Sequence, residues 1–174
     1  MQWPKLERDM TPIVREWLEG EGFLVKREMF CAFNCDLTGL HPLDGQWPER
    51  RRDFLALPAT AFALVAVELK KRDVGAVIQQ AAGNRGWADL SYVAMPVGTA
   101  PTAEVRCREL GLGLVRVSAS GLVLAVEAGG NRPAGVRRGG WCDLARANII
   151  RQFWPLVKAR NEKGGRDASH RQSD

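Results

Sequence analysis

The sequence predicts an α/β fold in which a central mixed β-sheet is flanked by helices. Residues 61–69 are apolar except for Glu68, as expected of a strand that is covered on both faces. A helical pattern over 73–86 and a short apolar strand over 90–96 follow it, and such a strand–helix–strand unit places its two strands in parallel. Residues 111–129 alternate between apolar and polar in two arms, which predicts an antiparallel hairpin.

The first part of the chain adds a leading helix and further strands. Apolar residues recur at helical spacing up to Leu18, and Gly20 and Gly22 then end the pattern. The second of the two strands that follow is either antiparallel to the first or a bent continuation of it. In order, we expect a helix over 4–19, strands over 22–30 and 33–40, a loop or insertion over 41–53, and a strand over 54–70 that is broken near Pro58.

The second part of the chain ends in a helix and a basic tail. A helix over 99–110 has Pro101 near its start and Gly111 just past its end. A glycine-rich basic loop precedes the last helix, which we expect over 141–160 with an apolar set of Leu144, Ile149, Ile150, Phe153 and Leu156. We therefore expect a core over 1–128, a basic loop and C-terminal helix packed on it over 129–160, and a disordered basic tail over 161–174.

Length and composition favour one globular domain and argue against a membrane protein. The chain has 174 residues, of which 45% are apolar and 26% charged. No apolar stretch approaches the roughly 20 residues needed to span a bilayer, so we expect a cytoplasmic protein. The four cysteines are too few for a disulfide framework. Cys31, Cys35 and His41 lack a second ligand pair at a usual zinc spacing, so we favour free thiols over a zinc site.

The positive charge is concentrated near the C-terminus. Residues 1–130 hold 15 basic and 16 acidic side chains, a net charge of −1, whereas residues 131–174 hold 10 and 4, a net charge of +6. A segment with this excess of cations suits a polyanion, and nucleic acid is the first candidate. A basic tail without a partner would have the same composition.

Two acidic residues close neighbouring apolar strands. Glu68 and Lys70 follow the longest apolar run and, two residues apart, project to the same face of a strand. Asp36 closes the apolar strand before it. Buried carboxylates at two strand ends are costly unless something neutralises them, and a divalent cation such as Mg²⁺ does so with carboxylate oxygens and waters. An ordinary surface ion pair is the alternative for Glu68 and Lys70, and a turn cap is the alternative for Asp36.

Six short stretches occur in a distinctive order over roughly residues 5–125. They are LERDMTPIVREWLEGEGFLV, CDLTGL, VAVELKK, VIQQAAGN, ADLSYVAMP and ELGLGLVRV. Together they resemble the PD-(D/E)XK nuclease superfamily, and within it small uncharacterised bacterial phosphodiesterases. The resemblance implies a restriction-endonuclease-like fold with an αβββαβ core. The chain departs from the family in having Cys35 rather than proline before Asp36, and in the 31 residues between Asp36 and Glu68.

The resemblance implies roles for individual residues. Asp36 and Glu68, with the Leu69 carbonyl, would bind the metal, and Lys70 would orient the attacking water or stabilise the transition state. A glutamine on the following helix would support them, either Gln80 or its neighbour Gln79. An acid on the first helix would complete the site, and spacing favours Glu7 over Glu16. Asp53, 15 residues before Glu68, is the rival for the metal aspartate, although Asp36 is favoured because it lies on an apolar strand.

The predicted function is Mg²⁺-dependent hydrolysis of DNA, with Mn²⁺ as a substitute metal and RNA as an alternative substrate. We expect Arg51, Arg52, Lys71, Arg72, Arg137 and Arg138 to bind phosphates, and Trp47 is the tryptophan best placed for base stacking. A chain of this size would need a homodimer or a larger partner to cut both strands of a duplex. The alternatives are a catalytically silent module on the same fold that binds nucleic acid or protein, and an unrelated α/β scaffold with an interaction role.

Overall fold

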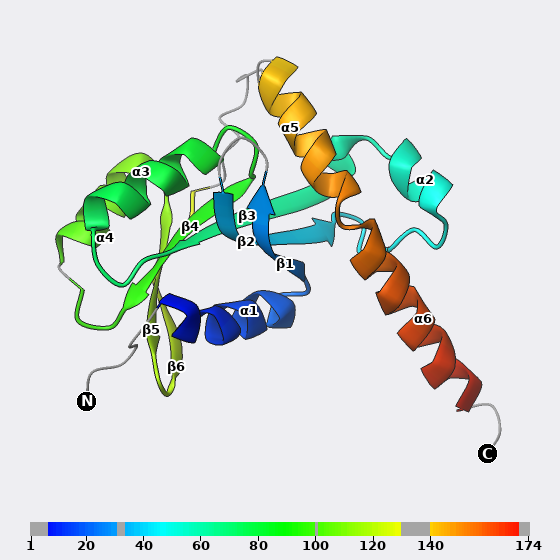
Figure 1. The fold of residues 1–174 in the computed structure, drawn as a ribbon, viewed down its shortest axis with the longest axis horizontal. Helices are drawn as coiled ribbons and strands as arrows, with labels where there is room; N and C mark the ends of the chain where they lie inside the picture. The colour runs from blue at the N-terminus through cyan, green and yellow to red at the C-terminus, as the bar shows by residue number, and fades with distance from the viewer. Residues whose placement is uncertain (1–6, 31–33, 100, 130–139, 171–174) are drawn as a thin grey trace.

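A six-stranded mixed sheet forms the centre of the computed structural model, which describes residues 7–30, 34–99, 101–129 and 140–170 (Figure 1). The strands lie in the sheet in their order along the chain. The β3–β4 and β4–β5 pairs are parallel, and the other three pairs are antiparallel. The predicted α/β class, with a mixed sheet flanked by helices, is confirmed. The strands are β1 (Leu24–Phe30), β2 (Asn34–Pro42), β3 (Phe62–Leu69), β4 (Leu90–Pro96), β5 (Gly113–Ser118) and β6 (Gly121–Val126).

Helices cover both faces of the sheet (Figure 1). Residues of β3 alternate between the faces: Val65 and Val67 pack in the cluster that contains α1, and Leu64 and Ala66 pack in the cluster that contains α5. Both parallel connections are helical and move along the sheet in the same direction, so α3 and α4 lie on the α5 face. The helices are α1 (Thr11–Gly20), α2 (Arg51–Ala56), α3 (Val74–Asn84), α4 (Thr102–Leu110), α5 (Gly140–Arg151) and α6 (Trp154–His170), with short 3₁₀ turns η1 (Glu7–Asp9) and η2 (Ala59–Ala61).

The segment before β3 differs from the prediction. Residues 54–61 are not strand, because α2 runs to Ala56 and η2 follows Pro58, so β3 begins at Phe62. α2 also takes up the last residues of the predicted loop over 41–53. A six-residue helix needs only one buried side chain, and here Phe54 packs against Phe62 while its neighbour Leu55 stays exposed. The short apolar run in the sequence therefore reflects one contact and not a strand.

The C-terminal segment also differs from the prediction of one helix over 141–160. It forms two helices, α5 and α6, separated at Gln152 and Phe153. Pro155 explains the break, because proline has no N–H to bond back into the preceding turn and is favoured at the start of a helix. Leu144 is 67% exposed, so Ile149, Ile150 and Phe153 carry the contact with the core.

The tail is helical further than expected. α6 continues to His170, where the sequence predicted disorder from residue 161, and residues 171–174 lie outside the described part of the chain. Extending a formed helix gains one hydrogen bond per residue without a new nucleus, which is why polar residues can prolong it. Of the predicted basic loop over 129–140, residues 130–139 lie outside the described part. Within the described residues, no helix combines the length and the apolar character needed to cross a membrane.

Candidate active site

The candidate site lies where β2 and β3 separate. Pairing between them ends at Leu37 and Val67, whereas β3 stays paired with β4 to Leu69, and the Lys70 N–H still donates to the Ala94 carbonyl. Beyond the last β2–β3 pair the Asp36 carboxylate replaces a backbone partner, because its Oδ2 accepts the Leu69 N–H at 2.8 Å. Asp36 and the end of β3 are therefore held together at this fork.

A distortion of β2 helps to place Asp36. Cys35 packs in the cluster under α5 but Leu37 packs in the cluster under α1, although residues two apart in a regular strand share a face. Glu28, which interrupts the β1–β2 pairing between Arg27 and Met29, has a φ of 50°, a left-handed conformation that is uncommon outside glycine. The irregular backbone allows Asp36 to reach across to β3.

Glu68 is buried beside Asp36. Only 2% of Glu68 is exposed, and its Oε1 accepts a hydrogen bond of 2.6 Å from the Asn84 Nδ2 of α3. Burial and the negative charge of Asp36 raise the pKa of Glu68 to about 7, and the Asn84 bond opposes this shift. Two carboxylates are thus held close together in a poorly solvated place.

The pKa of Asp36 is also raised, first by burial and then by the charge of Glu7. The Leu69 N–H and the positive charge of Lys70 act in the opposite direction, since both favour the ionised carboxylate. Lys70 therefore interacts electrostatically with Asp36, in addition to its ion pair with Glu7.

Lys70 and Glu7 meet at the open side of the site. The Lys70 Nζ lies 3.4 Å from the Glu7 Oε2, and the Lys71 N–H donates to the Glu7 Oε1 over the same distance. The two side chains are 30% and 45% exposed, so solvent reaches this part of the site while Glu68 stays covered. η1 thus closes the site from the side of α1, and a ligand can approach Lys70.

The structure brings together most of the predicted catalytic residues. Asp36, Glu68, Leu69, Lys70 and Glu7 all take part in the contacts described above. Their chain positions belong to η1, β2 and β3, so the fold and not the sequence order collects them.

The rivals lie elsewhere. Asp53 is on α2, next to Phe54, which packs at the start of β3. Glu68 lies six residues beyond Phe62 along β3, which corresponds to about 20 Å at the rise per residue of an extended strand. Glu16 is exposed on α1. Asp36, at the fork between β2 and β3, is therefore the aspartate beside Glu68, and Asp53 is distant from it.

The supporting residue on α3 differs from the prediction. Gln79 and Gln80 are both exposed, and the buried Asn84, one turn after Gln80, bonds Glu68 instead. Residues Val77, Ala81 and Asn84 recur at the helical spacing of the buried face. A polar residue in that apolar stripe is the signal that could have identified Asn84 from the sequence.

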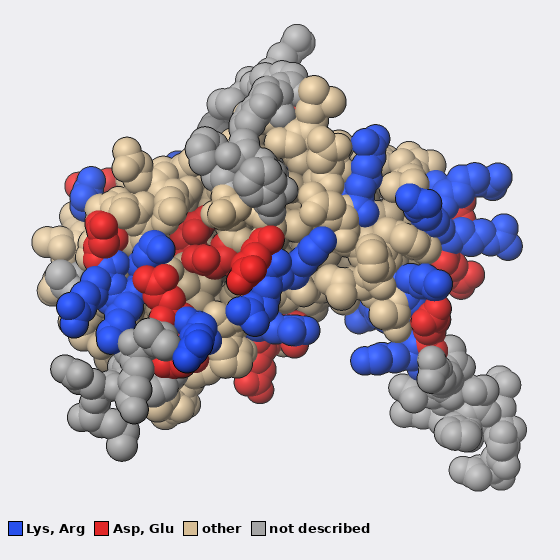
Figure 2. Space-filling model, in the orientation of Figure 1, with Lys and Arg blue, Asp and Glu red and all other residues tan. Residues whose placement is uncertain are grey.

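The predicted phosphate-binding residues fall into separate places. Lys71 and Arg72 follow the site directly, whereas Arg51 and Arg52 are on α2 near the other end of β3. Arg137 and Arg138 lie outside the described residues. Figure 2 shows Lys and Arg side chains beside the acidic ones at the centre of this face, and again over α2 and the first turns of α6.

Arg146, one of the cations of the basic C-terminal segment, has a structural role. It is 2% exposed and pairs with Asp89 at 2.7 Å. Its other bonds go to the backbone carbonyls of Ala59, Phe62 and Trp87. This cation is therefore used inside the protein.

The donor set suits a hard divalent cation. In the described part of the chain, no three His, Cys, Asp or Glu side chains are arranged to hold a metal by themselves. Two carboxylates, Asp36 and Glu68, with the Leu69 carbonyl and waters, would match the oxygen-rich and partly hydrated coordination of Mg²⁺. The buried Asn84 Oδ1, which has no hydrogen-bond partner among the described atoms, adds an unsatisfied oxygen beside Glu68. A cation would stabilise the ionised carboxylates, whose pKa values are raised by burial and by neighbouring negative charge.

Comparison with known proteins finds a similarity to a solved structure but no family. No protein-family model matches the chain, and no curated protein matches it either. A solved structure of a protein of unknown function from Silicibacter pomeroyi is similar, with a TM-score of 0.49 and 19% sequence identity. The similarity covers 92% of this chain and 90% of that chain.

Proposed function

We propose that this protein is a Mg²⁺-dependent nuclease of the PD-(D/E)XK superfamily. The observation that carries the proposal is the convergence of two carboxylates, the half-buried Asp36 and the buried Glu68, at the fork between β2 and β3, with Lys70 beside them. Perturbed carboxyl groups that face a cation at an accessible edge are typical of a catalytic site, whereas a structural ion pair needs only one partner.

Each residue of the site has a chemical task. Asp36 and Glu68 would hold the metal with the Leu69 carbonyl, and Asn84 keeps Glu68 in place. When bound, Mg²⁺ supplies an acidified water and positive charge beside the scissile phosphate. The Lys70 ammonium would donate to the attacking water or to a phosphate oxygen that gains charge in the transition state. Glu7 positions Lys70 through their contact of 3.4 Å. When substrate binds, the Lys70 ammonium would exchange this contact for one with the phosphate.

DNA is the proposed substrate, and RNA is the alternative. Lys71 and Arg72 would contact the phosphates next to the cut bond, because they follow Lys70 directly.

Cys35, Cys107 and Cys142 are free thiols, a state that suits a reducing compartment such as the cytoplasm.

The test is metal-dependent cleavage with a matched pair of lysine variants. Labelled single-stranded, nicked and duplex DNA, and a single-stranded RNA, are incubated with the full chain in Mg²⁺, Mn²⁺ or EDTA under single-turnover conditions. We expect Lys70→Met to slow cleavage by about 100-fold or more, the cost of removing one preorganised donor. Lys26→Met should stay within a few-fold of the unmodified protein, because the Lys26 Nζ donates to the Gln152 carbonyl and not to a residue of the site.

The second candidate is a catalytically silent module that binds nucleic acid or protein through the same surface. Absence of cleavage with every metal and substrate, together with salt-sensitive binding of nucleic acid, would favour this module over the nuclease. Cleavage that Lys70→Met leaves unchanged would also contradict the proposed site.

A further inference from the structure

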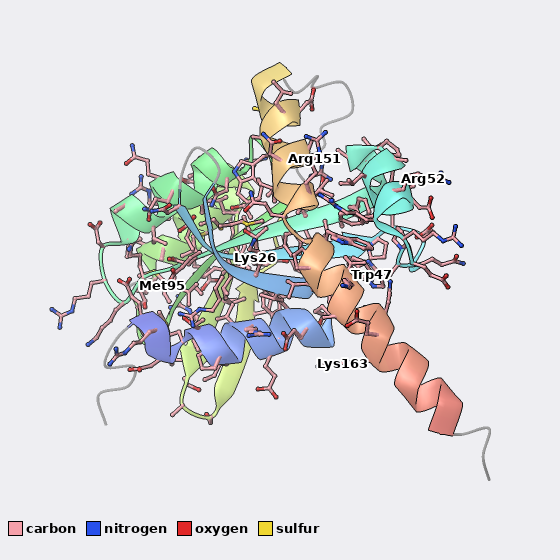
Figure 3. The ribbon with its side chains drawn as sticks, turned by 45° about the vertical axis from the view of Figure 1, so that its right-hand side comes forward. Lys26, Trp47, Arg52, Met95, Arg151 and Lys163 are labelled. Carbon is pink, nitrogen blue, oxygen red and sulfur yellow. The ribbon has the colours of Figure 1, made fainter. Side chains whose placement is uncertain are left out.

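A large open groove lies away from the candidate site, between α6 and the body of the protein. It has a volume of about 1340 Å³, and residues from α1, β1, the segment before α2, α2 itself and α6 line it. We call it the α6 groove. Figure 3 shows Trp47 beside α6, Lys163 on α6, and Arg52 turned outward from α2. Six cations line the α6 groove: Arg15, Arg50, Arg51, Lys158, Arg160 and Lys163.

An aromatic side chain lies among these cations. The ring of Trp47 packs near the core residue Phe62, with 6.5 Å between ring centroids. The Arg160 guanidinium carbon lies 5.8 Å from the Trp47 ring centroid. An indole ring that is only half buried, with a planar cation near it, offers the kind of surface on which an unpaired base stacks.

The acidic residues of the α6 groove do not cancel its charge. Glu19, Glu49 and Glu162 also line it, so acids are outnumbered two to one by the cations. Glu19 pairs with Arg15 and Glu162 pairs with Lys158, both four residues apart on exposed helix surfaces. Such pairs contribute little, about 0.3–0.5 kcal/mol, so a phosphate can replace the carboxylate as partner.

A second basic hollow shares a lining residue with the α6 groove and includes the residue that follows Glu7. It has a volume of about 590 Å³ and is lined by Arg8, Asp9, Arg15 and Arg27, with Thr11 and Pro12. Arg15 lines both hollows, and Arg8 directly follows Glu7, the partner of Lys70. Cations therefore run from Lys70 along α1 and β1 to Trp47.

We propose that the α6 groove and the second hollow bind a single-stranded extension of the nucleic acid that is cut at the candidate site. This inference rests on the proposed function. Stacking on Trp47 needs an exposed base face, which a paired duplex hides except at its ends. The cations come from η1, α1, β1, α2 with the segment before it, and α6, and they line two hollows that share Arg15, which gives one phosphate backbone partners in both. The substrate class is thus a strand with an unpaired segment, such as an overhang or a flap.

Binding measured without metal tests the inference separately from catalysis. Fluorescence anisotropy in EDTA would follow the full chain on an oligothymidine of about 20 nucleotides, longer than the roughly 4–16 nucleotides of common single-strand sites. A blunt duplex of equal length serves as the comparison. We expect tighter binding to the single strand, and a steep fall in affinity with salt.

Two matched arginine variants locate the path. Arg15 and Arg108 each pair with a glutamate four residues away on an exposed helix, at 2.7 and 2.9 Å, but only Arg15 lies between the two hollows. Arg15→Gln should lower the slope of log affinity against log salt by about 0.7, the value for one single-strand phosphate contact. Arg108→Gln should leave the slope unchanged, and equal slopes for the two variants would overturn the path.

Two further variants test the aromatic part. Trp47→Leu keeps an apolar contact near Phe62 but removes the stacking surface, and we expect about tenfold weaker binding to the single strand. Arg160→Gln should also weaken binding, and it leaves the core intact if Trp47→Leu does not fold. Unchanged affinity in Arg160→Gln and in a folded Trp47→Leu would overturn the α6 groove as the binding site. Groove-dependent binding without cleavage would instead contradict the proposed function alone.

Discussion

Glu68 carries much of the electrostatic cost of the candidate site. A carboxylate without water is expensive to ionise, and a second carboxylate, Asp36, adds repulsion. The 2.6 Å hydrogen bond from Asn84 stabilises the ionised form of Glu68 and so lowers its pKa, which offsets part of this cost. The protein therefore keeps Glu68 close to the point where it is half ionised near neutral pH, so a small change in its surroundings alters its charge.

Asn84 and Gln80 provide a matched test of this arrangement. Asn84→Ala removes a hydrogen bond that lowers the pKa of Glu68, so we expect that pKa to rise above about 7. The rising limb of the pH–rate profile should move to higher pH, and activity near neutral pH should fall by about tenfold or more, as for other residues that orient a metal ligand. Gln80→Ala, one exposed turn earlier, should leave both unchanged. A fall in rate without a shift of the profile would show that Asn84 acts only through stability.

The sequence was sufficient to place Glu68 and Lys70 at the end of an apolar strand. Asp36 was predicted to close a strand, but it lies near the start of β2. The sequence did not identify Asn84, since the prediction followed a family pattern to Gln80 and not the buried face of the helix. Which of Asp36 and Asp53 approaches Glu68 depends on β2–β3 pairing, a long-range property that no local spacing contains.

At the scale of elements, the long apolar runs were the reliable part of the prediction. β3, α3 and β4 follow from continuous or periodic apolar residues, and their parallel connection has a single favoured hand. The segment over 54–61 was mispredicted as strand, because a run of leucines and alanines around one buried phenylalanine has no distinct period. Besides its apolar contacts, α5 is held by a buried arginine, Arg146, whose polar character gave no indication of burial.

Arg146 fastens α5 to η2, β3 and the turn before β4. Arg146→Ala would leave the Asp89 carboxylate and three carbonyls without this donor, so we expect a loss of about 3–5 kcal/mol in the free energy of unfolding. Arg151→Ala, exposed on the same helix, should change stability by less than about 0.5 kcal/mol. Urea denaturation of both variants measures the difference. Equal stabilities would mean that α5 is held by its apolar contacts alone.

At the scale of the whole molecule, the charge excess at the C-terminus was only a partial guide to the binding surface. Arg146 is used internally, whereas the described cations of α6 line the α6 groove together with Arg15, Arg50 and Arg51. A groove made from residues about 150 positions apart in the chain cannot be predicted from composition, since it depends on how two distant helices lie against one sheet.

The folding stability of the whole chain should report the metal site through its pH dependence. Without metal, Glu68 keeps its proton up to about pH 7 in the folded state, whereas the unfolded side chain loses it near 4.5. Between these values the folded chain holds the extra proton, so raising the pH favours unfolding. Glu68→Gln removes the penalty, and we expect this variant to be more stable than the unmodified protein above pH 7, by up to about 3 kcal/mol.

Magnesium should reverse the difference in stability between Glu68→Gln and the unmodified protein. Because a carboxylate must lose its proton to bind a metal, the thermal stabilisation by Mg²⁺ should be small at pH 5.5 and grow through about pH 7. Glu68→Gln should abolish this growth, whereas Glu104→Gln, on an exposed residue of α4 with a lowered pKa, should retain it. Melting curves with and without Mg²⁺ across this range provide the measurement. A Mg²⁺ effect of equal size at every pH, or one that survives in Glu68→Gln, would show that the ion binds elsewhere.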